Sequence, residues 1–187
     1  IGNHDVATVG SPQRIKAQSA KRANVHFPNH YYAFVFKDAC LMMLDTNIYR
    51  GSVADKLWKF EDEFVQDEKC DGKQKIVMGH HPYKSSGVHG DAGGTRKRKY
   101  KKHLIGKFDM FIGGHDHNLS DEGEEDGTLL LVSGSGAKLR PCKSSRIYCE
   151  SINGLVKIDE NAIAEFITFK GSGVIDKDMH ETNQQED

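Results

Sequence analysis

Three short blocks of the chain carry the residue types that bind metal ions. They are Gly2-Asn3-His4-Asp5, Gly79-His80-His81-Pro82 and Gly113-Gly114-His115-Asp116-His117-Asn118. The second and third blocks each close a short apolar run that ends in glycine, which is typical of a buried β-strand in a sheet with covered faces. In such sheets ligands bind beyond the carboxyl ends of the strands, where these turns lie. Imidazole, amide and carboxylate groups gathered there predict a site for a first-row metal ion.

Hydrolysis of a phosphate ester is the chemistry that such a site could perform. The reaction requires neutralised phosphoryl oxygens, hydroxide near neutral pH and a protected leaving oxygen, and two metal ions about 3.5–4 Å apart supply all three. His80 and His115 offer imidazoles from two strand ends, and the neutral amide of Asn3 leaves a metal more electrophilic than a carboxylate would. His115 and His117 are two residues apart. An extended chain would point both the same way, whereas a tight turn can aim them at two adjacent metals.

In this order the blocks resemble the GNH[DE], GHxP and GHxH motifs of the calcineurin-like metallophosphoesterases. Finer details resemble the purple (tartrate-resistant) acid phosphatase branch, and the resemblance runs from residue 2 to about residue 141. The resemblance implies an α/β fold in which two mixed β-sheets form a sandwich flanked by helices. The segments that carry the finer resemblance are Phe27-Pro28-Asn29-His30-Tyr31-Tyr32, Leu44-Asp45-Thr46, Ser85-Ser86-Gly87-Val88-His89-Gly90, His115-Asp116-His117-Asn118-Leu119, and Ser133-Gly134-Ser135-Gly136 with Leu139-Arg140-Pro141.

The resemblance also implies a dinuclear metal centre. Asn3, His80 and His115 would bind a divalent metal ion, and His117 would bind the other metal, usually ferric iron in this branch. The expected pair is therefore Fe with Zn, Mn or a second Fe. The donor types do not select among these metals, because imidazole and amide suit several ions.

Catalytic roles follow from the same resemblance. His4 would face the substrate and protonate the leaving group while hydroxide attacks phosphorus in line, since a histidine pKa lies near working pH. Asp5 would orient His4, and His89 would also reach the substrate. Val88 stands where the family commonly has Glu, which weakens the expectation of an acid-assisted role for His89. His81 occupies the variable position of GHxP and is interpreted as a neighbour of the ligands.

The upstream motifs of the family are absent from this sequence. An Asp-bearing strand and a GDxxY or GDxxD turn would supply the bridging carboxylate and the remaining ligands. We therefore expect residues 1–175 to be an N-terminally truncated metallophosphoesterase domain, about two thirds of it, with the missing segment as its natural partner. Residues 176–187 have the polar composition of a disordered tail.

Composition narrows the function further. A net charge of −1 and a pI near 6.9 give no electrostatic reason to expect nucleic acid or an anionic membrane as a partner. No apolar stretch approaches the ~18 residues of a membrane span. The expected reaction is hydrolysis of a phosphomonoester, either a small molecule or a phosphopeptide. Two alternatives stay open: a phosphodiesterase on the same fold, and a non-catalytic remnant that binds a metal or a partner. Family resemblance would suit a secreted, lysosomal or periplasmic-like location.

The remaining patterns predict the framework around these residues. Strands are expected over residues 31–36, 40–45, 75–78, 108–112, 129–132, 154–158 and 162–169, helices over 53–69 and 95–107, and a polar loop over 6–30. The basic run over 96–102 reads as a solvated helix face. Cys40 is interpreted as a buried thiol, whereas Cys142 and Cys149 either close a small loop or stay free. Four further histidines are interpreted as surface or loop residues: His26, His30, His103 and His180.

Overall fold

The computed structural model describes residues 2–6, 27–48, 50–159, 161, 163–170 and 174–176. Most of the predicted loop over 6–30 and of the predicted tail over 176–187 lies outside these residues. The same is true of His26 and His180, so the predictions made for these parts of the chain stay predictions.

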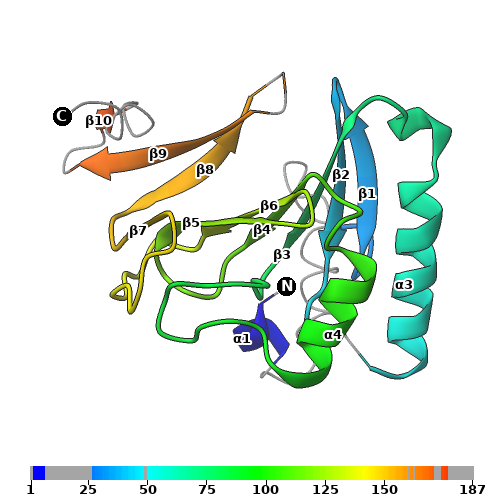
Figure 1. Cartoon of the computed structure of the whole chain (residues 1–187), viewed down its shortest axis with the longest axis horizontal. Coiled ribbons are helices and arrows are strands. Elements are labelled where there is room, and N and C mark those ends of the chain that lie inside the picture. The colour runs from blue at the N-terminus through cyan, green and yellow to red at the C-terminus, as the bar shows by residue number, and fades with distance from the viewer. Residues whose placement is uncertain are drawn as a thin grey trace.

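Seven strands form a mixed sheet in the order β1-β2-β3-β4-β6-β5-β7 (Figure 1). β2, β3, β4 and β6 run parallel to one another, while β1, β5 and β7 pair antiparallel with their neighbours. The carboxyl ends of the parallel strands therefore share one edge, and the turns that carry the histidines leave the sheet there. The bounds are β1 (Tyr32–Phe36), β2 (Ala39–Leu44), β3 (Gln74–Gly79), β4 (Met110–Gly113), β5 (Leu119–Glu125), β6 (Thr128–Ser133) and β7 (Tyr148–Glu150).

Two helices, α3 (Gly51–Val65) and α4 (Gly94–His103), pack on one face of this sheet (Figure 1). Successive side chains of a strand point to opposite faces, so every second strand residue joins the helices. Among the described helices, none is long and apolar enough to cross a membrane. The buried cluster on this face includes Cys40, Met42, Leu44, Val77, Phe111 and Leu130 of the strands with Leu57, Trp58, Phe64 and Tyr100 of the helices.

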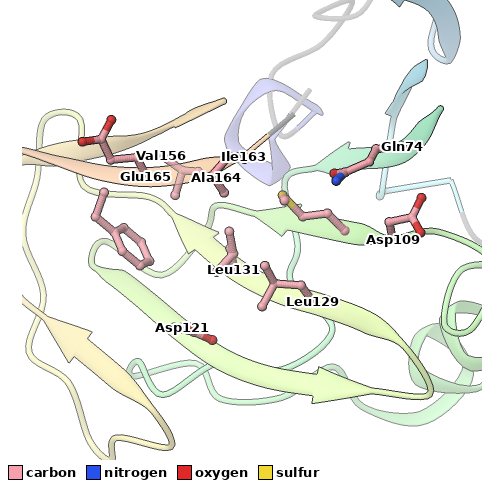
Figure 2. A pocket seen from close by; sticks show the side chains of 11 residues that line it. Gln74, Asp109, Asp121, Leu129, Leu131, Val156, Ile163, Ala164 and Glu165 are labelled. Carbon is pink, nitrogen blue, oxygen red and sulfur yellow. The ribbon is translucent and has the colours of Figure 1, made fainter. Parts of the chain in front are cut away.

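A small antiparallel sheet covers part of the opposite face. It consists of β8 (Gly154–Ile158), β9 (Ala164–Lys170) and β10 (Val174–Asp176) in the order β10-β9-β8. Phe166 packs there with Ile76, Ile112 and Leu131 of the large sheet. A cavity of about 370 Å³ remains between the two sheets, with Leu129 among the residues that line it (Figure 2). The result is the two-sheet α/β sandwich expected from the sequence.

Most predicted elements are present with shifted ends. The seven predicted strands correspond to β1, β2, β3, β4, β6, β8 and β9, and the two predicted helices to α3 and α4, each shorter than expected. A short 3₁₀ helix, η1 (Glu68–Cys70), follows α3. The pattern does not predict β5, β7 or β10. β5 is rich in acidic residues, and β7 and β10 have three residues each, so none of them shows an apolar alternation.

Two disulfides tie the chain together, Cys40–Cys70 and Cys142–Cys149. The interpretation of Cys40 as a thiol is wrong, although its burial is confirmed. Helix α3 runs back along the sheet and returns the chain at η1 beside the start of β2, which brings together two cysteines 30 residues apart. For Cys142 and Cys149 the loop-closing alternative is the one observed.

Helix α4 has one solvated face and one buried face. Lys97, Arg98, Lys101 and Lys102 are exposed, as expected from the basic run. The interpretation of His103 as a surface or loop residue is wrong. His103 is buried, its Nδ1 lies 2.9 Å from Oε2 of Glu61, and its ring stacks on Trp58. The sequence does not indicate this burial, because the residues just before His103 are basic and exposed. Only one side of this last turn of α4 packs on α3.

Candidate metal centre

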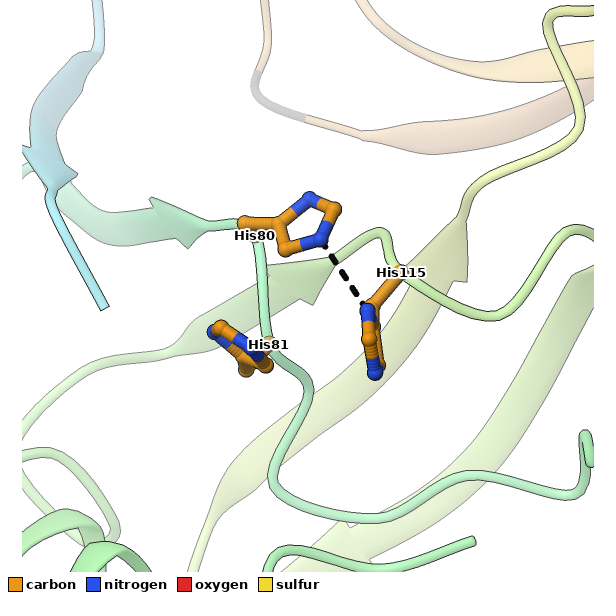
Figure 3. Close-up of side chains that lie close together, drawn as sticks. All are labelled: His80, His81 and His115. Carbon is orange, nitrogen blue, oxygen red and sulfur yellow. Dashed lines mark hydrogen bonds between the residues drawn. The ribbon is translucent and has the colours of Figure 1, made fainter. Parts of the chain in front are cut away.

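Side chains from all three blocks meet beyond the carboxyl edge of the sheet. Asn3 lies in α1 (Asn3–Val6), His80 directly follows β3, and His115 follows β4. The Nε2 atom of His80 lies 2.7 Å from Oδ1 of Asn3 and 3.0 Å from Nδ1 of His115 (Figure 3). A Cβ atom at Gly2 would lie 2.9 Å from the His80 ring, so a glycine is needed for the chain to pass this imidazole. The predicted divalent-metal ligands are thus brought together.

His81 completes a group of three imidazoles with His80 and His115 (Figure 3). Its ring is buried, and its Nδ1 is 2.8 Å from Oγ1 of Thr46, a residue that follows β2. The Thr46 hydroxyl also accepts a hydrogen bond from the His81 backbone N–H. Burial lowers the pKa of His81 to about 3, so this ring stays neutral.

An unusual turn aims the third block at the site. His115 has a φ of 64°, a left-handed conformation that few residues other than glycine adopt. The buried carboxylate of Asp116 accepts hydrogen bonds from the hydroxyl of Ser85 at 2.5 Å and from the backbone N–H of His89 at 2.9 Å. A Cβ atom at Gly134 would lie 1.8 Å from the Asp116 carbonyl oxygen, so the next loop packs tightly under this turn. Asp116 therefore acts as a turn residue and loop anchor.

His117 carries an unsatisfied buried nitrogen. Among the described residues its Nδ1 is buried and has no hydrogen-bond partner, which is costly for a polar atom unless a ligand occupies the site. Burial, and then the charge of Arg140, lower the pKa of His117. Burial, and then the nearby His89, likewise lower the pKa of His115. Both shifts favour the neutral ring, which is the form that binds a metal ion.

The donor set fits a metal ion. Ligands at bonds of about 2.1 Å to one ion lie about 3.0–3.4 Å apart. The Nε2 atom of His80 lies at 2.7 Å from Oδ1 of Asn3 and at 3.0 Å from Nδ1 of His115, close to that range. The orphaned Nδ1 of His117, two residues along the chain from His115, is a further nitrogen that could accept a ligand. By contrast, the group formed by Glu61, Asp62 and His103 already has a cation as its partner, because Nζ of Lys107 lies 3.2 Å from Glu61 and 2.8 Å from Asp62.

The three predicted catalytic residues differ in how far the structure describes them and in their contacts with the cluster. His4 is exposed, next to Asn3 in α1. The side chain of Asp5 lies outside those that the structure describes, so its orienting role stays a prediction. His89 joins the cluster: its ring stacks on His115 with centroids 4.3 Å apart.

Three contributors to the site carry no motif signal of their own. Thr46 fixes His81, and Arg140 donates a hydrogen bond from Nη1 to Nε2 of His89 at 2.5 Å. Glu122 of β5 anchors the loop that carries His89, by accepting hydrogen bonds from Ser86. Thr46 and Arg140 stand within segments that resemble the family, but only the folded contacts give them roles.

His30 is half-buried, and its Nδ1 lies 3.0 Å from the buried carboxylate of Asp45. This pair lies at the carboxyl end of β2, so His30 has a packed partner as well as its place in a loop. A cavity of about 460 Å³ beside His80 is lined by His30, Gly2 and several apolar side chains. Space therefore remains next to the metal ligands.

By sequence, the chain is similar to acid phosphatases. No protein-family model matches the chain. The tartrate-resistant acid phosphatase type 5 of Sus scrofa is 28% identical over 162 residues, which cover 76% of this chain and 47% of the relative. The chain thus spans about half the length of such curated relatives.

Solved structures show the same architecture. A purple acid phosphatase, PPD1 from yellow lupin (Lupinus luteus) seeds, matches with a TM-score of 0.63 at 15% identity, over 79% of this chain and 31% of that one. GAP50, described as the anchor in the inner membrane complex of Plasmodium, matches with a TM-score of 0.66 at 18% identity, over 95% of this chain and 64% of that one. The chain therefore has the calcineurin-like metallophosphoesterase fold of the purple acid phosphatases and their structural relatives.

Proposed function

We propose that the protein hydrolyses phosphomonoesters at a dinuclear metal centre. The observation that carries this proposal is the convergence of Asn3, His80 and His115, with separations of 2.7 and 3.0 Å that suit a shared ion. Sequence similarity to acid phosphatases over three quarters of the chain supports the same chemistry. When bound, the metals would supply hydroxide near neutral pH and neutralise charge on the phosphoryl group.

The residues of the chain divide the remaining work. Asn3, His80 and His115 would hold the divalent metal, and His117 would contribute to a second metal, with Fe and Zn, Mn or Fe as the proposed pair. His4 would donate a proton to the leaving oxygen, since its exposed imidazole is free to meet an incoming ester. Asp5 would orient His4. His89, stacked on His115, would contact the phosphoryl oxygens.

A segment preceding residue 2 would complete this centre. The curated relatives are about twice as long, and the cavity beside His80 leaves space for further ligands. The cavity between the sheets is lined by Leu129, Leu131 and other apolar side chains, and apolar residues of that segment would fill it (Figure 2). Two disulfides suit an oxidising compartment, so we propose a secreted or lysosomal location.

A non-catalytic role is the second candidate, and the match to GAP50 favours it. That protein is described as an anchor, and its match covers 95% of this chain. A protein without phosphatase activity could keep this two-sheet fold, because the packing of the two sheets does not depend on the imidazoles. The two candidates differ in one measurable property, which is turnover by the metal-loaded protein.

Replacement of one imidazole provides the test. In the full-length protein, His80→Ala should remove the divalent metal and nearly all hydrolysis of p-nitrophenyl phosphate, since the loss of one imidazole leaves the ion poorly held. His30→Ala, which removes a histidine outside the three-imidazole group, is the control for metal content and should keep the divalent metal. Metal content is measured on the purified variants together with turnover. Full metal occupancy with normal turnover in His80→Ala would refute the assignment, whereas a metal-loaded wild type without turnover would favour the anchoring role.

A further inference from the structure

The loop that follows β6 places a guanidinium group beside the imidazole cluster. Arg140 donates from Nη1 to Nε2 of His89, whose ring stacks on His115. Its backbone N–H donates to the carbonyl oxygen of His117 at 2.9 Å. The guanidinium is thus one imidazole ring away from a metal ligand, and its backbone is hydrogen-bonded to another.

The position of Arg140 is fixed by its surroundings. Two residues after Arg140, Cys142 forms a disulfide with Cys149, which lies in β7 of the large sheet. The backbone N–H of Lys143 donates to the Ser86 carbonyl oxygen at 2.8 Å, and its Nζ donates to the Val88 carbonyl oxygen at 2.9 Å. The Arg140 loop and the His89 loop are therefore hydrogen-bonded together. A donor held in place in this way loses little entropy when it binds a ligand.

We infer that Arg140 is a specificity-determining residue that binds two non-bridging oxygens of the phosphoryl group and thereby selects phosphomonoesters over phosphodiesters. This inference rests on the proposed phosphatase function and concerns the substrate class of the same site. Among the described residues, the Arg140 side chain makes one hydrogen bond, which leaves most of its N–H donors available.

The selectivity follows from the shape and charge of the two substrates. A guanidinium fork matches a pair of anionic oxygens with two parallel hydrogen bonds. A phosphomonoester dianion presents three such oxygens, so two can face Arg140. In a diester one of these positions carries the second ester group, and the net negative charge is smaller. One arm of the fork then lacks its acceptor, and an unpaired donor at a binding site carries a free-energy cost.

The experiment compares Arg140→Ala and Arg140→Lys with Lys138→Ala in the metal-loaded, full-length protein. Lys138 is an exposed cation two residues away, so its variant controls for the loss of one positive charge. Arg140→Ala should lower kcat/KM for p-nitrophenyl phosphate by about 10- to 100-fold, the range expected for hydrogen bonds to a charged group. Hydrolysis of bis(p-nitrophenyl) phosphate should fall less than about threefold. Arg140→Lys should recover only part of the loss, since a point charge lacks the fork.

Binding of inorganic phosphate, measured by calorimetry, gives a readout that does not need turnover. Arg140→Ala should weaken this binding about tenfold or more, and Lys138→Ala should change it less than about twofold. If the wild type hydrolyses neither ester but binds phosphate in an Arg140-dependent way, the proposed function fails and the assignment of Arg140 as the phosphate-binding residue stands. Equal losses for both esters, equal losses in Lys138→Ala and Arg140→Ala, or phosphate binding that does not depend on Arg140 would each overturn the inference.

Discussion

Removal of the Glu122 carboxylate should destabilise the protein more than removal of any exposed acidic group. This side chain is fully buried, and donors from three residues converge on it. The Ser86 backbone N–H donates at 2.5 Å and its hydroxyl at 2.8 Å, the Ser120 hydroxyl donates at 2.7 Å, and Nη1 of Arg146 donates at 2.6 Å. Glu122→Ala leaves all four donors without this acceptor.

The magnitude follows from the partners. Breaking a buried ion pair costs about 3–5 kcal/mol. Arg146 is about one-third exposed and keeps its hydrogen bonds to Asp91, so the lower part of that range applies, about 3 kcal/mol. Glu122→Gln keeps the shape but loses the charge and should cost about half as much. The free energy of unfolding, obtained from chemical denaturation, is the measurement.

Glu124→Ala is the matched control, because Glu124 lies on the same strand and is exposed. Its effect should stay within about 0.5 kcal/mol. The Ser86 contacts also anchor the loop that carries His89. If the proposed phosphatase function holds, Glu122→Ala should therefore lower turnover even where the protein remains folded. A loss of less than about 1 kcal/mol in Glu122→Ala would refute the reasoning that this network is fully satisfied and rigid.

Two further predictions concern the helical face and the turn under the metal centre. Burial raises the pKa of Glu61 to about 7, so the folded state holds a proton that the unfolded state releases above pH ~4.5, and stability falls as the pH rises from there through 7. Relative to Glu61→Gln, the free energy of unfolding of the wild type should fall by on the order of 1–2 kcal/mol between pH 5 and 8. Unfolding is followed by the fluorescence of Trp58, the single tryptophan. A difference in stability between the two proteins that does not change with pH would contradict this. Gly134→Ala should cost about 2–3 kcal/mol, because the new Cβ meets the Asp116 carbonyl oxygen. Gly136→Ala has open space around the new Cβ and should leave stability unchanged. Thermal unfolding of the two variants measures both effects, and similar losses in both would refute the argument.

Predictability of the fold from the sequence depended on apolar patterning. β3, β4 and β6 are short apolar runs, and each could be located within two residues of its observed ends. β5 could not be located, because its acidic side chains are satisfied by partners far away in sequence, as Glu122 is by Arg146. Such pairing has no local signature. The same reason explains the missed Cys40–Cys70 disulfide.

Predictability of the site depended on motif spacing. Asn3, His80 and His115 could be assigned to one centre before any geometry was known, because their blocks follow one another in a familiar order. The roles of Thr46 and Arg140 could not be assigned in this way. Both residues act through hydrogen bonds to a histidine on another loop, and only the packing of these loops reveals the contacts.

The left-handed backbone of His115 sets stability against metal binding at a single position. A residue with a Cβ atom costs about 1–2 kcal/mol in this conformation, and glycine avoids that cost. A redesign of the chain for thermal stability alone would therefore favour glycine at this position and would delete an imidazole from the centre. Folding gives no reason for a histidine here. The proposed role of His115 as a metal ligand would account for a histidine in this strained conformation.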